Sequence, residues 1–209
     1  MPKQRVVAFV DGFNMYHSLQ SNGLKRFKWV DYRSLAMKFI APTVDDLTSV
    51  FYFSALAKWD TEKMEKHKTY MKALRWAGVE PILGNFKTVE RKCQATCHQK
   101  YQTFEEKETD VNIAIYVVKM ALQDEYDKAL LFSADSDLIP AINTVQKVMP
   151  HKTIKVVFPF NRVSEHMRKV CLGDTARVKI KHLETSLFPD PIVIDAAKDI
   201  EINCPASWK

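Results

Sequence analysis

The sequence predicts an α/β fold built on a mostly parallel sheet. Two short runs, 5–10 and 129–132, have the continuous apolar character of strands that are buried on both faces. Each run is closely followed by an aspartate, Asp11 or Asp135, and then by a helical pattern. Strands that alternate with helices in this way are joined by right-handed crossovers, which make neighbouring strands parallel.

The elements between these two strands continue the alternation. Met15 and Leu19 stand at helical spacing and predict a helix directly after the first strand. Thr61 is a suitable N-cap and Gly78 a suitable stop for a helix between them. Further helices are expected at 31–40, 61–77, 111–122, 138–148 and 164–172, and further strands at 47–56, 79–86, 153–158 and 177–181, the last as a strand or a sheet edge.

Two segments in the middle of the chain differ strongly in polarity. The segment 111–122 is apolar on nearly all sides, which predicts a buried helix. The segment 90–107 before it is polar and is the least regular part of the chain.

Composition and charge suggest a globular domain with a polyanionic partner. The 209 residues are 46% hydrophobic and 27% charged, so a sizeable core can form. The net charge is +6, but residues 1–181 hold 29 basic and 20 acidic residues, a net charge of +9. We expect a domain at 1–181 followed by an acidic, proline-containing tail at 182–209, either packed on the domain or loose. A basic domain favours nucleic acid as its partner.

The expected location is the cytoplasm. No apolar run reaches the length of a membrane span. The apolar run near the start of the chain ends after five residues at Asp11, which is too short for the core of a signal peptide.

Four aspartates are expected to meet at one edge of the sheet. Asp11 and Asp135 follow the carboxyl ends of strands, Asp137 stands one residue beyond Asp135, and Asp110 opens the helix that leads back into the second buried strand. Ligands of parallel sheets bind beyond the carboxyl ends of the strands. A helix packed antiparallel to its strand begins at that same edge. The four carboxylates therefore gather if the two buried strands are neighbours.

A local explanation competes with a metal site. Asp135 or Ser136 is a suitable cap for the helix that follows, and Asp11 and Asn14 for the first helix. Capping accounts for one acid of the pair at Asp135 and Asp137, but not for both. Carboxylates this close repel each other unless a cation or a proton lies between them. Hard divalent cations with oxygen ligands, Mg²⁺ or Mn²⁺, relieve that repulsion, and a pair of them about 3.5–4 Å apart supports phosphodiester cleavage.

Three motifs taken together resemble the NYN domain family of the PIN-like nuclease group. They are V-x-x-F-V-D-G-F-N near the start, E-K-x-x-D-V before the helix at 111–122, and L-x-S-x-D-S-D-L-x-P after the second buried strand. All three occur in the family order and bracket roughly residues 5–160.

The resemblance implies a three-layer α/β/α sandwich with strand order 3-2-1-4-5 and metal-dependent cleavage of RNA. Ala134 departs from the family pattern, because family members usually have Gly before the last acid pair. Carried over motif by motif, the resemblance implies site residues at Asp11, Asn14, Asp110, Asp135 and Asp137.

The resulting hypothesis is a Mg²⁺- or Mn²⁺-dependent endoribonuclease in which a metal-activated water attacks the phosphorus. Asp11, Asp110 and Asp135 would hold metal, and Asp137 would bind metal or orient the water. Asn14 would fix the scissile phosphate or a metal-bound water. The alternatives are a non-catalytic RNA- or protein-binding module on the same fold, and an enzyme that acts on a small metabolite. The oligomeric state stays open, a homodimer included.

One helix of the predicted domain carries a basic stripe. Lys68, Lys72 and Arg75 stand at i, i+4 and i+7 within 61–77. Such a stripe is either a solvated face or a surface that contacts the RNA backbone without reading sequence.

Cysteines and a histidine precede the motif at Asp110. The run Cys93-x3-Cys97-His98 supplies part of a structural Zn²⁺ site, in which both thiolates would bind the metal and hold the start of the following helix. The alternatives are two free thiols with a surface histidine, or a Cys–His nucleophile. A tetrahedral site needs a fourth ligand from elsewhere, with the candidates Cys171, His166 and His151.

Overall fold

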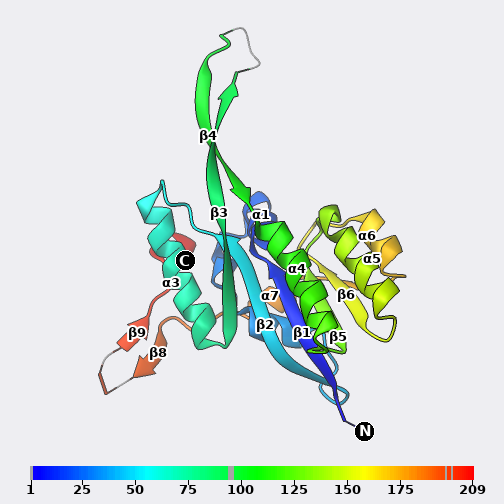
Figure 1. Ribbon diagram of the computed structural model, residues 1–209. Helices are drawn as coiled ribbons and strands as arrows, with labels where there is room; N and C mark the ends of the chain where they lie inside the picture. Colours follow the sequence, from blue (N-terminus) through cyan, green and yellow to red (C-terminus); the bar gives the residue numbers. More distant parts are fainter. Residues whose placement is uncertain (1, 94–96, 196, 199) are drawn as a thin grey trace.

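The protein is built around a seven-stranded sheet in the order β4-β3-β2-β1-β5-β6-β7 (Figure 1). Every neighbouring pair is parallel except β3 with β4. The computed structural model describes residues 2–93, 97–195, 197–198 and 200–209. The strands are β1 (Gln4–Asp11), β2 (Asp45–Ala55), β3 (Val79–Lys92), β4 (Lys100–Lys107), β5 (Lys128–Phe132), β6 (Thr153–Phe158) and β7 (Thr175–Arg177).

The predicted α/β class is confirmed. The five strands expected at 5–10, 47–56, 79–86, 129–132 and 153–158 stand in the expected order 3-2-1-4-5, and β1 pairs with β5 as the meeting of the aspartates requires. The sheet is larger than expected because β4 and the short β7 extend it at its two edges. The strand expected at 177–181 is shorter and earlier, since the chain turns into a helix at Ile180.

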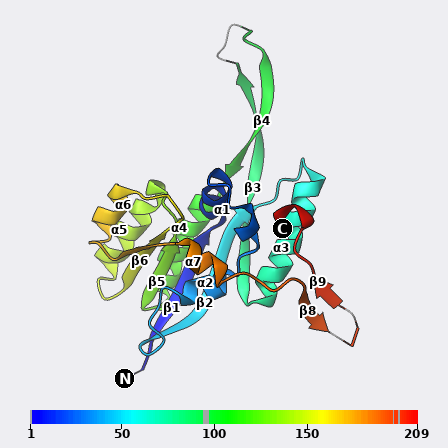
Figure 2. The same cartoon turned by 180° about the vertical axis from the view of Figure 1, so that it is seen from behind.

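Helices cover both faces of the sheet and make three layers (Figures 1 and 2). One layer holds α1 (Gly12–Ser21), α2 (Tyr32–Met37), α3 (Thr61–Trp76) and α7 (Ile180–Glu184); the other holds α4 (Thr109–Leu122), α5 (Ile139–Val148) and α6 (Glu165–Val170). Strand β1 serves both layers, because alternate side chains point to opposite faces: Val6 and Ala8 join one core cluster, and Val7 and Phe9 join the other.

Two expectations about helices need correction. Asp60 caps α3 by accepting a hydrogen bond from the Lys63 amide, whereas Thr61 is the first helical residue. Helix α4 is not buried on all sides. Only the side that carries Ile113 and Val117 faces the sheet, whereas the exposed fractions of Val111 and Ile115 are 59% and 54%.

The polar segment 90–107 contains a strand, contrary to the expectation of an irregular segment. Asn85 to Lys92 pair with Lys100 to Lys107 in an antiparallel ladder, so β3 and β4 form a long hairpin. The first residues of β3, Val79 to Gly84, pair with β2 inside the sheet. The hairpin therefore continues past the carboxyl edge and rises above the body (Figure 1). The sequence analysis did not predict β4 because no face of this strand is buried, so its side chains show no alternation of apolar and polar residues.

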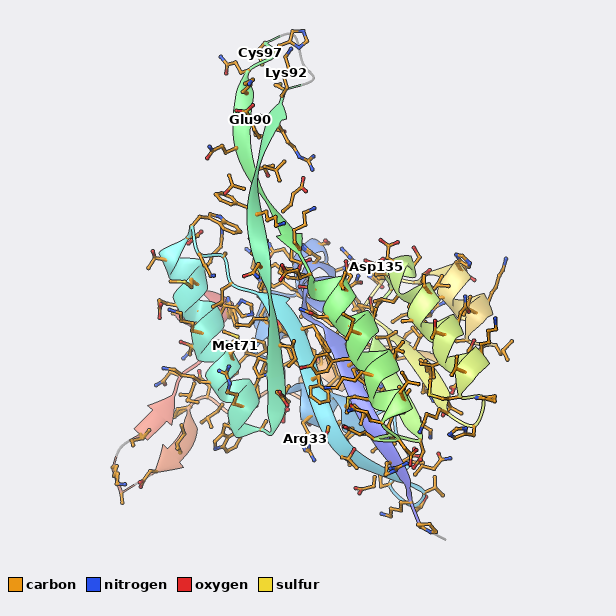
Figure 3. All side chains as sticks on the ribbon, viewed as in Figure 1. Arg33, Met71, Glu90, Lys92, Cys97 and Asp135 are labelled. Atoms are coloured by element: carbon orange, nitrogen blue, oxygen red, sulfur yellow. The ribbon has the colours of Figure 1, made fainter. Side chains whose placement is uncertain are left out.

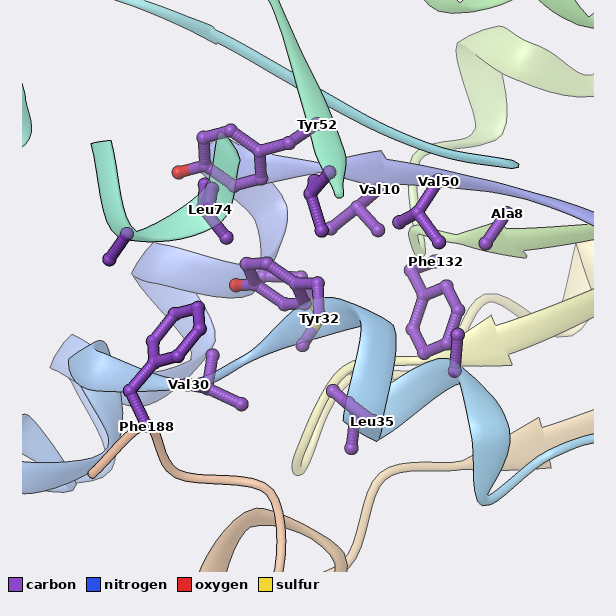
Figure 4. Close-up of a cluster of buried hydrophobic side chains, with 14 of the residues drawn as sticks. Ala8, Val10, Val30, Tyr32, Leu35, Val50, Tyr52, Leu74, Phe132 and Phe188 are labelled. Carbon is purple, nitrogen blue, oxygen red and sulfur yellow. The ribbon is translucent and has the colours of Figure 1, made fainter. Parts of the chain in front are cut away.

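The boundary expected between residues 181 and 182 falls inside α7, and the segment after it packs into the body. Phe188 and Ile192 are buried in the core cluster on the side of the sheet that α1, α2, α3 and α7 cover. The Trp29 ring packs edge-on against Phe188. Figure 4 shows Phe188 beside Val30 and Tyr32. The segment also carries a small antiparallel pair, β8 (Ile192–Asp195) and β9 (Ile200–Ile202).

None of the helices in the described residues combines the length and the apolar character that crossing a membrane would require.

Candidate active site

Asp11 is the last residue of β1 and the N-cap of α1, so the capping interpretation holds for it. Its Oδ1 accepts a hydrogen bond from the Asn14 amide at 2.8 Å. Its side chain is buried, at 2% exposure for the residue. The capping bond uses only Oδ1, which leaves Oδ2 of this buried carboxylate for a second partner.

Gly12 lets α1 approach β2 closely. A Cβ at this position would lie 2.6 Å from the Phe53 carbonyl oxygen and 2.6 Å from Cζ of Tyr52. Gly12 is helical and does not adopt a positive φ. Glycine is therefore required here because it has no side chain, and not because of its backbone flexibility. The close approach fixes the position of Asp11 relative to the sheet edge.

The hydroxyl of Ser133 links the two acid-bearing loops. Ser133 is fully buried and donates to Oδ2 of Asp11 at 2.8 Å. The same Oγ accepts a hydrogen bond from the Asp135 amide at 3.0 Å, and Oδ1 of Asp135 accepts from the Asp137 amide at 3.0 Å. Asp11 and Asp135 therefore lie on either side of one hydroxyl. The sequence analysis did not single out Ser133; the available signal was a hydroxyl two residues before Asp135, where it can bond the backbone.

Alanine is compatible with the turn at position 134. Ala134 does not adopt a positive φ, so the absence of the usual family glycine causes no strain. The Ala134 amide donates to Oδ1 of Asn14 at 3.3 Å. Asn14 is thereby held with its amide oxygen toward the loop after β5, and its Nδ2 group remains a donor for a ligand.

The base of the hairpin delivers Asp110 to the same edge. A Cβ on Gly84 would lie 2.7 Å from the Lys107 carbonyl oxygen, so the two hairpin strands touch closely there. The Thr109 amide donates to Oε1 of Glu106 at 2.9 Å, and Nδ2 of Asn85 donates to Oε2 of Glu108 at 2.9 Å. These contacts start α4 directly at the edge, with Asp110 in its first turn.

The acids are coupled electrostatically. The pKa of Asp11 is raised to about 6, chiefly by burial and also by the charges of Asp110 and Asp135, against hydrogen bonds from the Asn14 amide and the Ser133 hydroxyl that lower it. The pKa of Asp110 is raised to about 6 by burial, then by the charges of Asp135, Glu106 and Asp137. We call Asp11, Asp110, Asp135 and Asp137 the acid rim.

Glu106 is a fifth carboxylate close to the acid rim that sequence reasoning missed. It lies in the motif E-K-x-x-D-V, four residues before Asp110. Its charge raises the pKa of Asp110, while its Oε1 caps the start of α4. It therefore helps to position Asp110 as well as adding charge.

The acid rim has the donor type that Mg²⁺ and Mn²⁺ prefer, namely carboxylate oxygens with a neutral amide beside them. Within the described residues, however, no three His, Cys, Asp or Glu side chains are close enough together to hold a metal ion as placed. The residues therefore fit a hard cation in the chemistry of their oxygen donors and in their mutual repulsion, but not in their spacing as placed.

The basic stripe of Lys68, Lys72 and Arg75 does not reach the acid rim. Helix α3 begins after β2 at the carboxyl edge and runs back toward the amino edge (Figure 1). Lys72 and Arg75 lie in its last turns and are exposed, and Lys68 forms an ion pair with Glu65 at 2.7 Å.

The cysteine–histidine segment lies at the far end of the hairpin, with Cys97 and Lys92 well above Asp135 in Figure 3. Cys97 and His98 are exposed, Cys93 is half-buried, and residues 94–96 between them lie outside the described residues. From Asn85 to Lys92 the ladder spans about 20 Å at roughly 3.3 Å per residue. The tip therefore does not hold the first turn of α4 directly, contrary to the expected zinc clip.

None of the candidate fourth ligands for zinc is near the tip. Cys171 is buried in the core cluster beneath α5 and α6, His166 lies on α6, and His151 follows α5. These elements lie on the body, away from the hairpin (Figure 1).

A three-layer α/β fold with aspartates at the carboxyl ends of β1 and β5 is the arrangement of a PIN-like class of protein. The NYN domain model matches residues 5–174, and the chain belongs to the NYN domain family. Its fold is similar to the crystal structure of a protein of unknown function from Vibrio parahaemolyticus, with a TM-score of 0.60 and 17% identity over 89% of this chain and 97% of the other. No curated protein matches the chain.

Proposed function

We propose that the protein is a Mg²⁺- or Mn²⁺-dependent ribonuclease that cleaves RNA internally at the acid rim. Membership of the NYN family, which groups with PIN-like nucleases, supports a hydrolase that acts on RNA. The observation that carries the proposal is the Ser133 hydroxyl, which bonds both the Asp11 carboxylate and the Asp135 amide. Capping of α1 uses only Oδ1 of Asp11, so it does not account for the bond between Oδ2 and the buried hydroxyl that also holds the backbone at Asp135.

Each residue of the rim has a distinct part in this proposal. Asp11, Asp110 and Asp135 would hold the cation, and Asp137, which is exposed, would ligate it or accept a proton from the attacking water. The Nδ2 group of Asn14 would donate to a non-bridging oxygen of the scissile phosphate. When bound, the divalent cation would neutralise charge on the phosphate and acidify water.

Protonation sets the working pH of the rim. Asp11 and Asp110, with pKa values of about 6, are predominantly anionic above pH 7 and predominantly protonated below pH 5. The rim therefore gains the charge needed to hold a cation as the pH rises through about 6.

The deciding experiment is incubation of the purified protein with end-labelled single-stranded RNA in Mg²⁺, Mn²⁺ or EDTA. We expect internal cleavage with either metal and none in EDTA. Asp135→Asn should lower the cleavage rate by about a hundredfold or more, since it removes a charge at the reacting centre and keeps the shape.

Other outcomes would identify the competing functions. RNA that is bound but never cut with either metal would indicate a binding module on the same fold. Intact RNA without binding would favour a small metabolite as substrate. A wild-type cleavage rate for Asp135→Asn would remove the acid rim from the reaction.

A further inference from the structure

A cavity of about 370 Å³ opens directly beside the acid rim, between α1, β2 and α3. Its volume is within the range of small-ligand sites, which is roughly 300–1,000 Å³. Gly12 and Phe13, the two residues that follow Asp11, form part of its wall. We call this space the aromatic cavity. The proposed cleavage does not by itself account for it.

The interior of the aromatic cavity is built from rings. Tyr32 and Tyr52 stack with ring centroids 5.3 Å apart, as Figure 4 shows. The Tyr70 hydroxyl donates to the Val30 carbonyl oxygen at 2.6 Å, which fixes the third ring. All three tyrosines are nearly buried in the core, at 3%, 5% and 3% exposure, so they form a rigid wall against which a flat, apolar group can pack.

One polar pair interrupts the aromatic wall. Ser54 Oγ lies 3.4 Å from Nε2 of His67, and both residues line the cavity. Burial lowers the pKa of His67 to about 4, so the imidazole is neutral at pH 7 and offers one donor and one acceptor. A neutral donor–acceptor group suits the edge of a nucleobase better than an ion.

The mouth of the cavity is basic. Lys25, Lys28, Lys63 and Lys66 line it. Lys63 pairs with Asp60 at 2.8 Å and Lys66 pairs with Glu62, whereas Lys25 and Lys28 form no ion pair within the described residues and carry the uncompensated charge. Lys28 is held in place, because its Nζ donates to Oε1 of Gln20 at 2.6 Å and lies 4.4 Å from the centroid of the Tyr16 ring. Lysines at the mouth complement an anionic group, and aromatic rings in the interior complement a flat, apolar group. The cavity therefore suits a ligand that has one of these groups at each end.

The aromatic surface continues from the cavity onto the base of the hairpin. Phe86 lines the cavity and packs edge-on against Phe13 at 5.6 Å and Trp59 at 4.6 Å. Trp59 stacks on Phe104 at 3.8 Å, and these two rings are 42% and 36% exposed. A line of rings of this kind is typical of single-strand binding, in which successive bases stack on aromatic side chains.

We propose that the aromatic cavity binds one nucleotide unit of the substrate strand, with the base packed against the aromatic wall and its phosphate at the lysines. The neighbouring phosphate of the strand then lies at the acid rim. The inference rests on the proposed function for the identity of the strand, but the cavity's preference for a nucleoside phosphate stands on its own residues. A free nucleotide has the same chemistry and is the other source to be tested.

Binding should therefore depend on the base as well as on the phosphates. Base–aromatic stacking contributes enough that removing one base should weaken binding by about tenfold or more. Replacing phosphate-contacting lysines instead weakens binding to all strands and flattens its salt dependence.

The test uses the full chain carrying Asp135→Asn, in EDTA, so that cleavage does not intervene. Fluorescence anisotropy measures the affinity for a short labelled RNA and for the same backbone with abasic positions. We expect the abasic strand to bind about tenfold more weakly, and Ala57→Phe, which fills the cavity, to abolish that difference. Equal affinities for the two strands would overturn the proposal.

Two lysine pairs provide a second, independent variant and its control. Lys25→Gln with Lys28→Gln should weaken binding of the RNA severalfold. Lys147→Gln with Lys169→Gln removes the same charge from exposed positions on α5 and α6 in the other helical layer, and should leave the affinity unchanged. An equal effect of both pairs would mean that only net charge matters, and would also overturn the proposal. Melting curves identify any variant that fails to fold. If Ala57→Phe fails to fold, the comparison of the two lysine pairs still tests the proposal.

Titration with nucleoside monophosphates separates the two sources. Weak binding of the mononucleotide and tight binding of the strand would identify an RNA subsite, whereas equal affinities would identify a free nucleotide as the ligand. Base-dependent binding by a protein that never cuts RNA would refute the ribonuclease and leave the cavity assignment intact. If the protein cleaves RNA at a rate that changes neither with removal of the base nor with Ala57→Phe, the ribonuclease is supported and the cavity assignment is refuted.

Discussion

At the scale of single residues, the Ser133 hydroxyl sets the relation between Asp11 and Asp135. It hydrogen-bonds a carboxylate oxygen of the first and the amide of the second. Its bond to Asp11 favours the charged form of that carboxylate, and so opposes the rise in pKa caused by burial. Ser133 is a positioning residue, because it acts through the two aspartates and not on the substrate.

Ser133→Ala should therefore raise the pKa of Asp11 above about 6. We expect the cleavage rate in Mn²⁺ to fall by about tenfold or more at pH 6, as is typical for loss of a group that orients a metal ligand. The loss should be smaller at pH 8, where Asp11 is ionised in both proteins. Rates at the two pH values measure this, with the exposed Ser21→Ala as control. An equal loss at both would indicate a displaced loop and no effect on ionisation.

Asp135→Asn should stabilise the fold when no metal is present. Because Asp11 and Asp110 have folded-state pKa values raised from 3.8 to about 6, the folded chain binds more protons than the unfolded chain between about pH 4 and 6. Stability therefore falls as the pH rises through that window, and the penalty is complete above it. Removing the Asp135 charge relieves part of this penalty.

Melting in EDTA tests the sign. We expect Asp135→Asn to raise the Tm at pH 7.5 by a few degrees, since about 1 kcal/mol corresponds to roughly 2–4 °C for a domain of this size. The gain should vanish at pH 4, where Asp11 and Asp110 are protonated. Asp46→Asn is the control, because Asp46 is exposed at the start of β2, at the opposite edge. A lower Tm at pH 7.5 would contradict the electrostatic coupling.

At the scale of elements, the base of the hairpin and not its tip positions Asp110. Close contact at Gly84 and the bond from the Thr109 amide to Glu106 fix the start of α4. Cys93 and Cys97 lie at the other end of the ladder. The two thiols are therefore separated from the acid rim by the length of the hairpin.

Cys93→Ser with Cys97→Ser should leave the Tm within about 1 °C and the cleavage rate within about twofold, as is usual for substitutions away from the core. Elemental analysis of protein purified without added metal accompanies the measurement. Zinc near one per chain that is lost in the variant, together with a lower Tm, would establish a structural zinc site at the tip. Zinc retained by the variant would place the metal elsewhere.

Helix α3 offers two sets of cations on different sides. Lys63 and Lys66 face the aromatic cavity, whereas Lys68, Lys72 and Arg75 form the stripe that leads to the amino edge. We propose that the stripe makes secondary phosphate contacts, weaker per residue than those of the lysines at the cavity mouth. Distance from the acid rim is the reason.

The salt dependence of RNA affinity measures both sets. Each phosphate contact on a single strand contributes about 0.7 to the slope of log K against log salt. Lys25→Gln with Lys28→Gln should flatten the slope by about 1.4, and the triple replacement of the stripe by less than about 0.7. A flattening of about 2 for the stripe would show that the strand follows the outer side of α3.

At the scale of the whole molecule, the sheet joins an anionic rim to a basic cavity. In the proposed reaction the rim would repel a polyanion until a cation binds, and the lysines at the cavity would attract it. Metal binding should consequently stabilise the folded state by mass action. At a Mn²⁺ concentration about 100 times the Kd the gain is about 2.7 kcal/mol, or roughly 5–10 °C in Tm. A Tm that is the same in EDTA and millimolar Mn²⁺ would count against a metal site; Asp135→Asn should show a smaller shift than the wild type.

Much of the fold could be predicted because its signals are local. The buried runs of β1 and β5 and the acids that follow them place Asp11 and Asp135 at one sheet edge as soon as β1 and β5 are neighbours. The hairpin could not be predicted in this way, because Lys87 to Lys92 pair across the ladder through backbone bonds while their side chains face water. Strands that pair only through backbone hydrogen bonds need no regular alternation of apolar and polar residues, which is the pattern from which strands are predicted.

The sequence by itself determined the α/β class, because the periodicity of strands and helices is written along the chain. The strand order, confirmed for five strands, and the choice of the four acids came from the resemblance of three motifs to the NYN domain family. Only the tertiary structure decided what surrounds the acids. The Ser133 bridge joins residues 122 positions apart, and the aromatic cavity takes Tyr16, Tyr52, Tyr70 and Trp208 from separate elements. Contacts between distant residues depend on how helices and strands pack against one another. This packing produces no local pattern in the sequence from which the contacts could be predicted.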